Sequence, residues 1–250
     1  MRKDILKALF AAILFLSIVQ LPLNAQQENE SPPGYGELVQ WAYGQDQELV
    51  NGLQYYNGHP RSLGHPYLLE GWVHQGSVSI RGKLYSEIWI KYDIHAQQVE
   101  VEYQTMGGAD NQVILVSDRV DGFTIGPYSF KRLKLEVEQD DELDDEQFYQ
   151  ILGKERLIWY IRWEKNLVPL VGDPRFIEEF TSPKRNYLLE LDGSIHPFSN
   201  KLSFVKLFPE SIQKDIKRLI KSNQLQIRSA SSEQLELFIM AARNILEGAD

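Results

Sequence analysis

Cysteine is missing from this sequence of 250 residues. Its absence excludes a disulfide framework, a thiolate-ligated metal site and a lipid-modified cysteine. A domain without disulfides needs a substantial hydrophobic core, and a chain of this length can bury well over half of its unfolded surface. A core of ordinary size can therefore replace disulfides here.

An excess of positive charge is missing as well. The chain has 26 Lys and Arg against 35 Asp and Glu, a net charge of -9. Without residues 1–25, which are interpreted below as an export signal, the chain has 23 against 34, a net charge of -11. Nucleic-acid binding needs a basic surface that displaces counterions, so we expect no nucleic-acid partner. The same balance disfavours docking on anionic lipid headgroups.

The sequence has no apolar run long enough to be a convincing membrane span. Arg2, Lys3 and Lys7 precede an apolar segment of 12 residues, 8–19, whereas a membrane-spanning helix needs about 20. A basic start, a short apolar core and a small residue at Ala25 are typical of an export signal. We expect cleavage after Ala25, which leaves a soluble periplasmic or extracellular protein without a membrane span. An uncleaved anchor is the alternative.

The remaining chain divides by composition into three parts. Residues 26–36 are polar and include Pro32 and Pro33, which predicts a disordered leader. Residues 37–198 carry the strand-like patterns and residues 199–248 the helix-like ones.

A strict alternation of residue types marks the clearest strand, residues 84–94. One predicted face carries the residues Leu84, Ser86, Ile88, Ile90, Tyr92 and Ile94. The other carries Tyr85, Glu87, Trp89, Lys91 and Asp93. In a second strand-like segment, 156–163, Trp159 and Trp163 share one predicted face with Leu157 and Ile161, so we expect them in the core.

Short strands at close spacing continue along the chain, separated by turn signals such as Gly107-Gly108 and Asp121-Gly122. Connections this short join antiparallel neighbours, because a parallel crossover needs a dozen or more residues. The sequence therefore predicts an α+β, mainly β fold: an antiparallel meander sheet, barrel-like or a sandwich, followed by C-terminal helices packed on it.

Two amphipathic helices are predicted after residue 199. The first covers residues 209–223. The second begins at the capping box formed by Ser231 and Gln234 and runs to about residue 246. Its apolar stripe, which we expect to be buried, consists of Leu235, Phe238, Ile239, Ala242 and Leu246.

Several short motifs occur together in this sequence: Tyr56-Asn57-Gly58, Gly64-His65-Pro66-Tyr67, Trp72, Gly76-Ser77-Val78, Tyr85, Lys91-Tyr92-Asp93-Ile94, Phe148-Tyr149-Gln150-Ile151-Leu152, Arg162 and the segment 216–227. In this combination the chain resembles an uncharacterised family of exported proteins from Gram-negative bacteria, over most of residues 50–247. That family has no established activity, so the resemblance implies export and a single domain but no site.

The metal-capable side chains gather in one region, where the sequence places His59, His65, His74, His95 and Asp93. Their spacing lacks the pairs a turn or a few residues apart that zinc sites use, so we expect no metal or other cofactor. The acidic run 136–146 lacks the glycine and ligand spacing of an EF-hand loop and is interpreted as a solvated hairpin tip.

No catalytic signature is present: Gly-x-Ser-x-Gly, His-Glu-x-x-His and a cysteine nucleophile are all absent. We therefore expect a non-enzymatic cell-envelope protein that binds an unidentified envelope protein or ligand. Its candidate binding face carries Trp89 with Tyr85, Lys91 and Asp93, because this aromatic has polar neighbours. The alternative is a periplasmic hydrolase or metal-dependent enzyme that uses the His65, His74 and His95 region.

Overall fold

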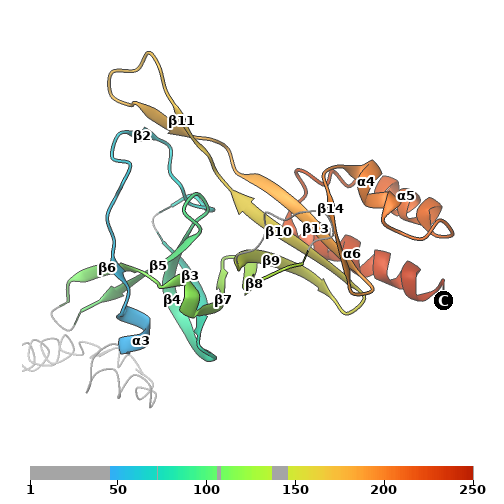
Figure 1. Ribbon diagram of the computed structural model, residues 1–250, viewed down its shortest axis with the longest axis horizontal. Coiled ribbons are helices and arrows are strands. Elements are labelled where there is room, and N and C mark those ends of the chain that lie inside the picture. The colour runs from blue at the N-terminus through green and yellow to red at the C-terminus, as the bar shows by residue number, and fades with distance from the viewer. Residues whose placement is uncertain (1–45, 72, 106–107, 137–145, 250) are drawn as a thin grey trace, which may run out of the picture. The chain divides into compact units, whose positions relative to one another are not determined.

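Antiparallel pairing of short strands dominates the fold (Figure 1). The computed structural model describes residues 46–71, 73–105, 108–136 and 146–249. The predicted signal peptide, the predicted leader and residues 137–145 of the acidic run lie outside these residues, so their interpretations stay predictions.

Within the described residues, one sheet has eleven strands in the order β1-β6-β5-β4-β3-β7-β8-β9-β10-β13-β14. The strands are β1 (Leu53–Gln54), β3 (His74–Ile80), β4 (Lys83–Asp93), β5 (Gln98–Gln104), β6 (Asp110–Ile114), β7 (Val120–Ile125), β8 (Tyr128–Leu133), β9 (Gln147–Lys154), β10 (Leu157–Glu164), β13 (Lys184–Leu191) and β14 (Ser194–Phe198). All neighbouring strands of this sheet are antiparallel.

The predicted fold class is confirmed, since the protein is mainly β with C-terminal helices. The outermost strands β1 and β14 do not pair with each other, so the sheet is not closed into a barrel. A second sheet contains β11 (Leu167–Pro169), β12 (Glu178–Phe180) and β2 (Ser62–Leu63), and its β12–β2 pair is parallel. In Figure 1, β2 and β11 lie close together although about a hundred residues separate them.

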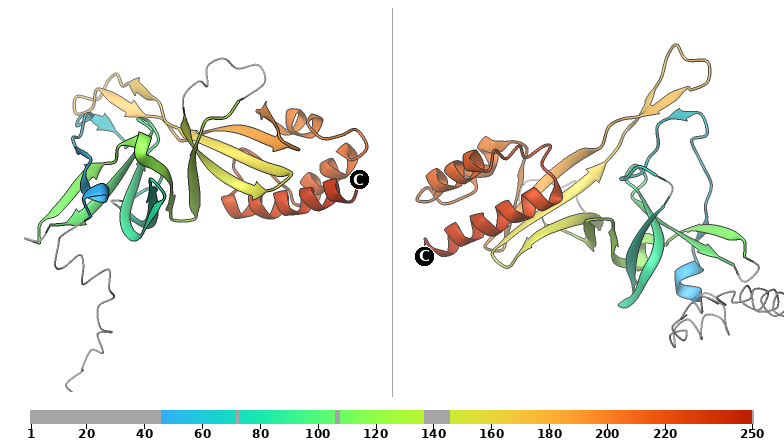
Figure 2. Two further views of the ribbon diagram at one scale, coloured as in Figure 1. Left: turned by 60° about the horizontal axis from the view of Figure 1, so that its bottom comes forward. Right: turned by 180° about the vertical axis from the view of Figure 1, so that it is seen from behind.

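The helices follow the last strand, apart from the short elements α3 (Gln47–Val50) and η1 (Ser117–Arg119). They are α4 (Lys201–Lys206), α5 (Gln213–Ser222) and α6 (Ser232–Glu247). Helix α6 packs on β9 and β10, α5 packs on α6, and α4 packs on α5 (Figure 2). The helices thus cover one face of the C-terminal strands.

Helix α6 follows the sequence pattern closely. The Ser231 amide donates to Gln234 Oε1 at 2.9 Å, and the Gln234 amide donates to Ser231 Oγ at 3.2 Å. This capping box satisfies two donors at the start of the helix. The five residues predicted to be buried, Leu235, Phe238, Ile239, Ala242 and Leu246, are buried, so the prediction for this helix is confirmed.

Strand β10 has a different apolar surface on each side. Trp159 and Trp163 are buried with the helices in the main core, as predicted, and the Trp159 ring stacks on Phe204 with centroids 5.1 Å apart. The opposite side carries Tyr160, which belongs to a smaller buried cluster with Leu135, Tyr149 and Leu188. Arg162, two residues after Tyr160, lies on the same side of β10 as this second cluster.

Candidate ligand-binding groove

The predicted binding face of β4 is divided by a β-bulge. The register between β3 and β4 shifts between Gly76 and Val78, and Glu87 has a φ of 56°. The extra residue in β4 moves Tyr85 to the core side, where it lies opposite Val78, while Trp89 stays on the other side and is 46% exposed. The prediction that Tyr85 and Trp89 share one face is therefore wrong.

Lys91 lies on the same face as Trp89 but is buried. Its ammonium group is 4.8 Å from the ring centroid of Tyr67 and 5.9 Å from that of Tyr55, which both come from the chain before β3. In the register of the sheet Lys91 is the direct partner of Glu100 on β5. Burial lowers the pKa of Lys91. The Lys91 side chain is thus covered by the chain before β3 and does not lie on an open face with Trp89.

Glu100 is the acceptor at the centre of this buried cluster. Tyr67 Oη donates to its carboxylate at 3.2 Å, and Gln112 Nε2 donates at 2.6 Å. Burial raises the pKa of Glu100 to about 7, although the Lys91 charge acts in the opposite direction. Sequence reasoning missed Glu100, because alternation places it on a face that looks polar and gives no sign that Tyr67 covers it.

Asp93 has a local role in the turn between β4 and β5. Its Oδ1 accepts from the amides of His95 at 2.8 Å and Ala96 at 2.7 Å. Burial raises the pKa of Asp93, whereas these two hydrogen bonds lower it. The carboxylate is thus occupied in holding the turn, as aspartate commonly is.

The histidines form two separate pairs of contacts. His65 Nε2 lies 2.9 Å from Glu70 Oε2, and His74 Nε2 lies 2.7 Å from the Glu70 carbonyl oxygen. The rings of His59 and His95 meet edge to face with centroids 5.8 Å apart. No group of three or more His, Asp or Glu able to hold a metal occurs in the part of the chain that the structure describes. The enzyme alternative based on His65, His74 and His95 gains no support from this arrangement.

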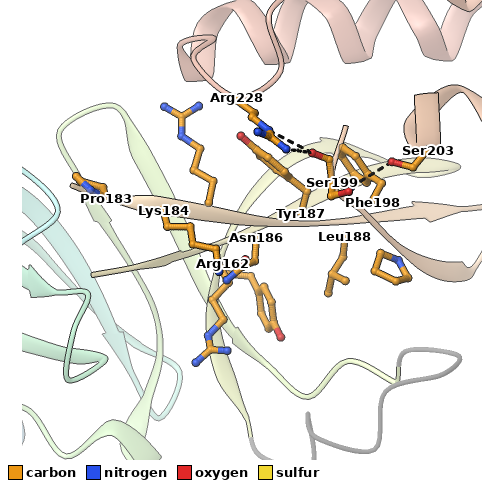
Figure 3. Close-up of a pocket in the computed structure, with 13 residues that line it drawn as sticks. Arg162, Pro183, Lys184, Asn186, Tyr187, Leu188, Phe198, Ser199, Ser203 and Arg228 are labelled. Carbon is orange, nitrogen blue, oxygen red and sulfur yellow. Dashed lines mark hydrogen bonds between the residues drawn. The ribbon is translucent and has the colours of Figure 1, made fainter. Parts of the chain in front are cut away.

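A groove of about 1100 Å³ surrounds the start of β13 (Figure 3). Strand β13 pairs with β10 along residues 184–191 but with β14 only along residues 187–191. Among the described strands, the edge of residues 184–186 therefore has no neighbour. Figure 3 shows Arg162 and Leu188 on one side of β13 and Tyr187 and Arg228 on the other, so the groove reaches both sides of a free strand edge.

Two arginines of the groove are held by neutral carbonyl groups. Arg185 Nη1 donates to the Ala230 carbonyl at 2.6 Å, and its guanidinium lies 4.4 Å from the ring centroid of Trp163. Arg228 Nη2 donates to the Ser199 carbonyl at 3.3 Å. Carbonyl acceptors fix the orientation of a guanidinium without neutralising its charge, so both arginines stay available for an anion.

Arg162 is the cation on the opposite side of β13. It is the register partner of Asn186, and its Nε is buried without a hydrogen-bond partner in the described part of the chain. Burial raises the pKa of the neighbouring Tyr149 phenol, and the Arg162 charge acts against this. Lys184 differs, because its Nζ bonds Glu164 at 2.9 Å. Arg162 lines the groove, so the positive charge of its guanidinium would stabilise an anion bound there.

The wall of the groove on the helix side is aromatic and fixed. The rings of Tyr187 and Phe198 stack with centroids 5.3 Å apart, and Tyr187 Oη donates to the Ile227 carbonyl at 3.0 Å. Sequence reasoning missed the whole groove. Its cations come from β10, β13 and the segment before α6, and no local pattern connects these three positions.

Comparison with known protein families, curated proteins and solved structures finds no match to this chain. The resemblance to a family of exported proteins thus stays an expectation. Among the described residues, none of the helices has the length and apolar character that crossing a membrane requires. The groove is therefore interpreted from its own geometry and charge.

Proposed function

We propose that this protein is an exported binding protein of the cell envelope that holds an elongated anionic ligand in the groove beside β13. Export is supported by the basic start, short apolar core and Ala25 of the N-terminal segment. Binding is supported by one observation above the others: Arg162, Arg185 and Arg228 surround a free strand edge, and none forms an ion pair with a carboxylate of the described residues. Although burial acts to raise the pKa of Glu164, the Arg162 charge is among the causes that lower it.

The ligand chemistry follows from the geometry of these cations. Guanidinium groups bind carboxylates and phosphates through paired donors. Because Arg162 and Arg228 lie on opposite sides of β13, one compact anion does not reach both (Figure 3). A ligand that carries carboxylate or phosphate groups along an extended backbone matches this spacing, and the aromatic wall at Tyr187 supplies apolar contact.

Fluorescence anisotropy tests this proposal with two labelled probes, an acidic ten-residue peptide of alternating Glu and Val and a ten-unit polyphosphate. At low salt we expect at least one probe to bind, and Arg162→Met to weaken that binding about tenfold. Lys154→Met is the matched control, since Lys154 is an exposed cation at the end of β9 outside the groove. Equal effects of the two substitutions, or no binding of either probe, would contradict the proposal.

A further inference from the structure

Positive charge is concentrated in one segment of this acidic protein. Residues 199–228 contain seven Lys and Arg against two Asp and Glu, a local charge of +5 in a chain of net charge -9. The net charge of the whole chain conceals this reversal. Charges farther apart than about 8 Å are largely screened at physiological ionic strength, so the local charge decides what this surface attracts.

Helix α5 arranges its cations on the side away from the core. Ile216 and Ile220 are buried. Positions 214, 217, 218 and 221 recur at helical spacing on the opposite side, and all four are exposed cations. Arg218 pairs with Asp215 at 3.1 Å. The three lysines of this stripe have no ion pair within the residues that the structure covers.

A mostly apolar hollow adjoins this stripe. It has a volume of about 550 Å³ and is lined by Asn200, Lys201, Leu202, Val205, Lys217 and Lys221. Leu202 is 66% exposed although it is a large apolar residue. An exposed leucine among three lysines, over an apolar hollow, combines the two features by which surfaces bind at a membrane interface.

We propose that this α4/α5 surface docks on anionic lipid bilayers, with the lysines at the headgroups and Leu202 in the interface. Lysines favour a lipid surface over an acidic protein site, because their compact, hydrated charges suit a diffuse negative field, whereas bidentate carboxylate recognition favours arginine. Neighbouring cations of the stripe from Lys214 to Lys221 are at most three residues apart, about 4.5 Å along the axis at 1.5 Å per residue. This is less than the screening distance, so they act as one patch of charge.

Sedimentation with vesicles tests the proposal. The purified protein should bind vesicles of 30% phosphatidylglycerol in phosphatidylcholine and not vesicles of phosphatidylcholine alone. The double variant Lys217→Glu/Lys221→Glu should lower the partition coefficient about tenfold or more. The control Lys131→Glu/Lys154→Glu makes the same charge change at exposed positions on β8 and β9 and should keep most of the binding.

Two further variants distinguish docking through the α4/α5 surface from attraction by charge alone and from binding at the groove. Leu202→Asn should weaken vesicle binding without a change of charge, and Arg162→Met in the groove should leave it intact. Equal losses in the two double variants would overturn the proposal, because nonspecific attraction would then suffice. So would vesicle binding that is absent while an acidic peptide binds at Lys217 and Lys221, since the partner would then be a protein.

Discussion

Lys91 and Glu100 are direct neighbours across β4 and β5, and both charged side chains are almost completely buried, at 4% and 3% exposure. Removing two charges from water is costly and is only partly repaid by their attraction. Tyr67 and Gln112 donate the hydrogen bonds that make the burial of Glu100 tolerable. The contacts of Lys91 and Glu100 with Tyr67 therefore hold the segment before β3 against the sheet.

The first prediction concerns the pH dependence that Glu100 creates. Its pKa is about 7 in the folded protein against 4.5 ordinarily, so the folded state binds more protons between these values. The contribution of Glu100 to the free energy of unfolding is fully present below pH 4.5 and is lost as the pH rises through 7, by about 3 kcal/mol. Urea unfolding at pH 5 and pH 8 should show this loss in the wild type and much less of it in Glu100→Gln. An equal loss of unfolding free energy in the wild type and in Glu100→Gln would contradict the conclusion that Glu100 causes this pH dependence.

The second prediction concerns α6. Phe238 is buried in the core, so Phe238→Ala should lower the free energy of unfolding by about 3 to 5 kcal/mol. The adjacent Leu237 is 60% exposed, and Leu237→Ala should change it by about 0.5 kcal/mol or less. Chemical denaturation of the two variants measures both values. Similar values would mean that the apolar stripe of α6 does not hold the helix on the sheet.

The third prediction concerns a buried polar link between the sheet and α6. Trp163 Nε1 donates to Gln150 Oε1 at 2.8 Å, and Gln150 Nε2 donates to Ser232 Oγ at 2.7 Å. Gln150→Leu leaves the Trp163 donor buried without an acceptor, which should cost about 1 to 3 kcal/mol. Ser232→Ala removes the acceptor of Gln150 Nε2, but Ser232 is only partly buried, so water can replace the lost oxygen and the substitution should cost less in the same denaturation assay. A larger loss of stability in Ser232→Ala than in Gln150→Leu would show that the hydrogen bond from Trp163 contributes less than the one to Ser232.

The fourth prediction concerns export. In a Gram-negative host, the protein in the periplasmic or extracellular fraction should begin at Gln26, because cleavage is expected after Ala25. Ala25→Arg should block this processing, since signal cleavage requires a small residue there. Mass spectrometry of the wild type and of Ala25→Arg measures the mass of each chain and so shows whether residues 1–25 have been removed. A full-length wild-type protein confined to the cytoplasm would contradict export.

The sequence predicted those elements whose signal is local. Trp159 and Trp163 share a predicted strand face with Leu157 and Ile161, and Ser231 with Gln234 marks a helix start. Both signals depend on residues a few positions apart. Tyr85 was misplaced because a bulge at Glu87 reverses the alternation, and alternation alone contains no sign of an inserted residue.

The binding groove could not be predicted for a different reason. Arg162 and Arg228 become parts of one site only because β14 ends opposite Tyr187 and leaves the start of β13 without a neighbour. Where a strand ends relative to its partner depends on long-range register. The short strands β2 and β12 were missed because two or three residues do not establish a pattern.

The location of bound ligand tests the central claim most directly. In a titration of isotope-labelled protein with the acidic peptide or the polyphosphate, followed by amide chemical shifts, we expect the largest changes at residues 184–186 and at Ser199 and Arg228. These changes should be lost in Arg162→Met at the same probe concentration. Shifts confined to α5, with residues 184–186 unmoved, would contradict the assignment of the groove as the binding site.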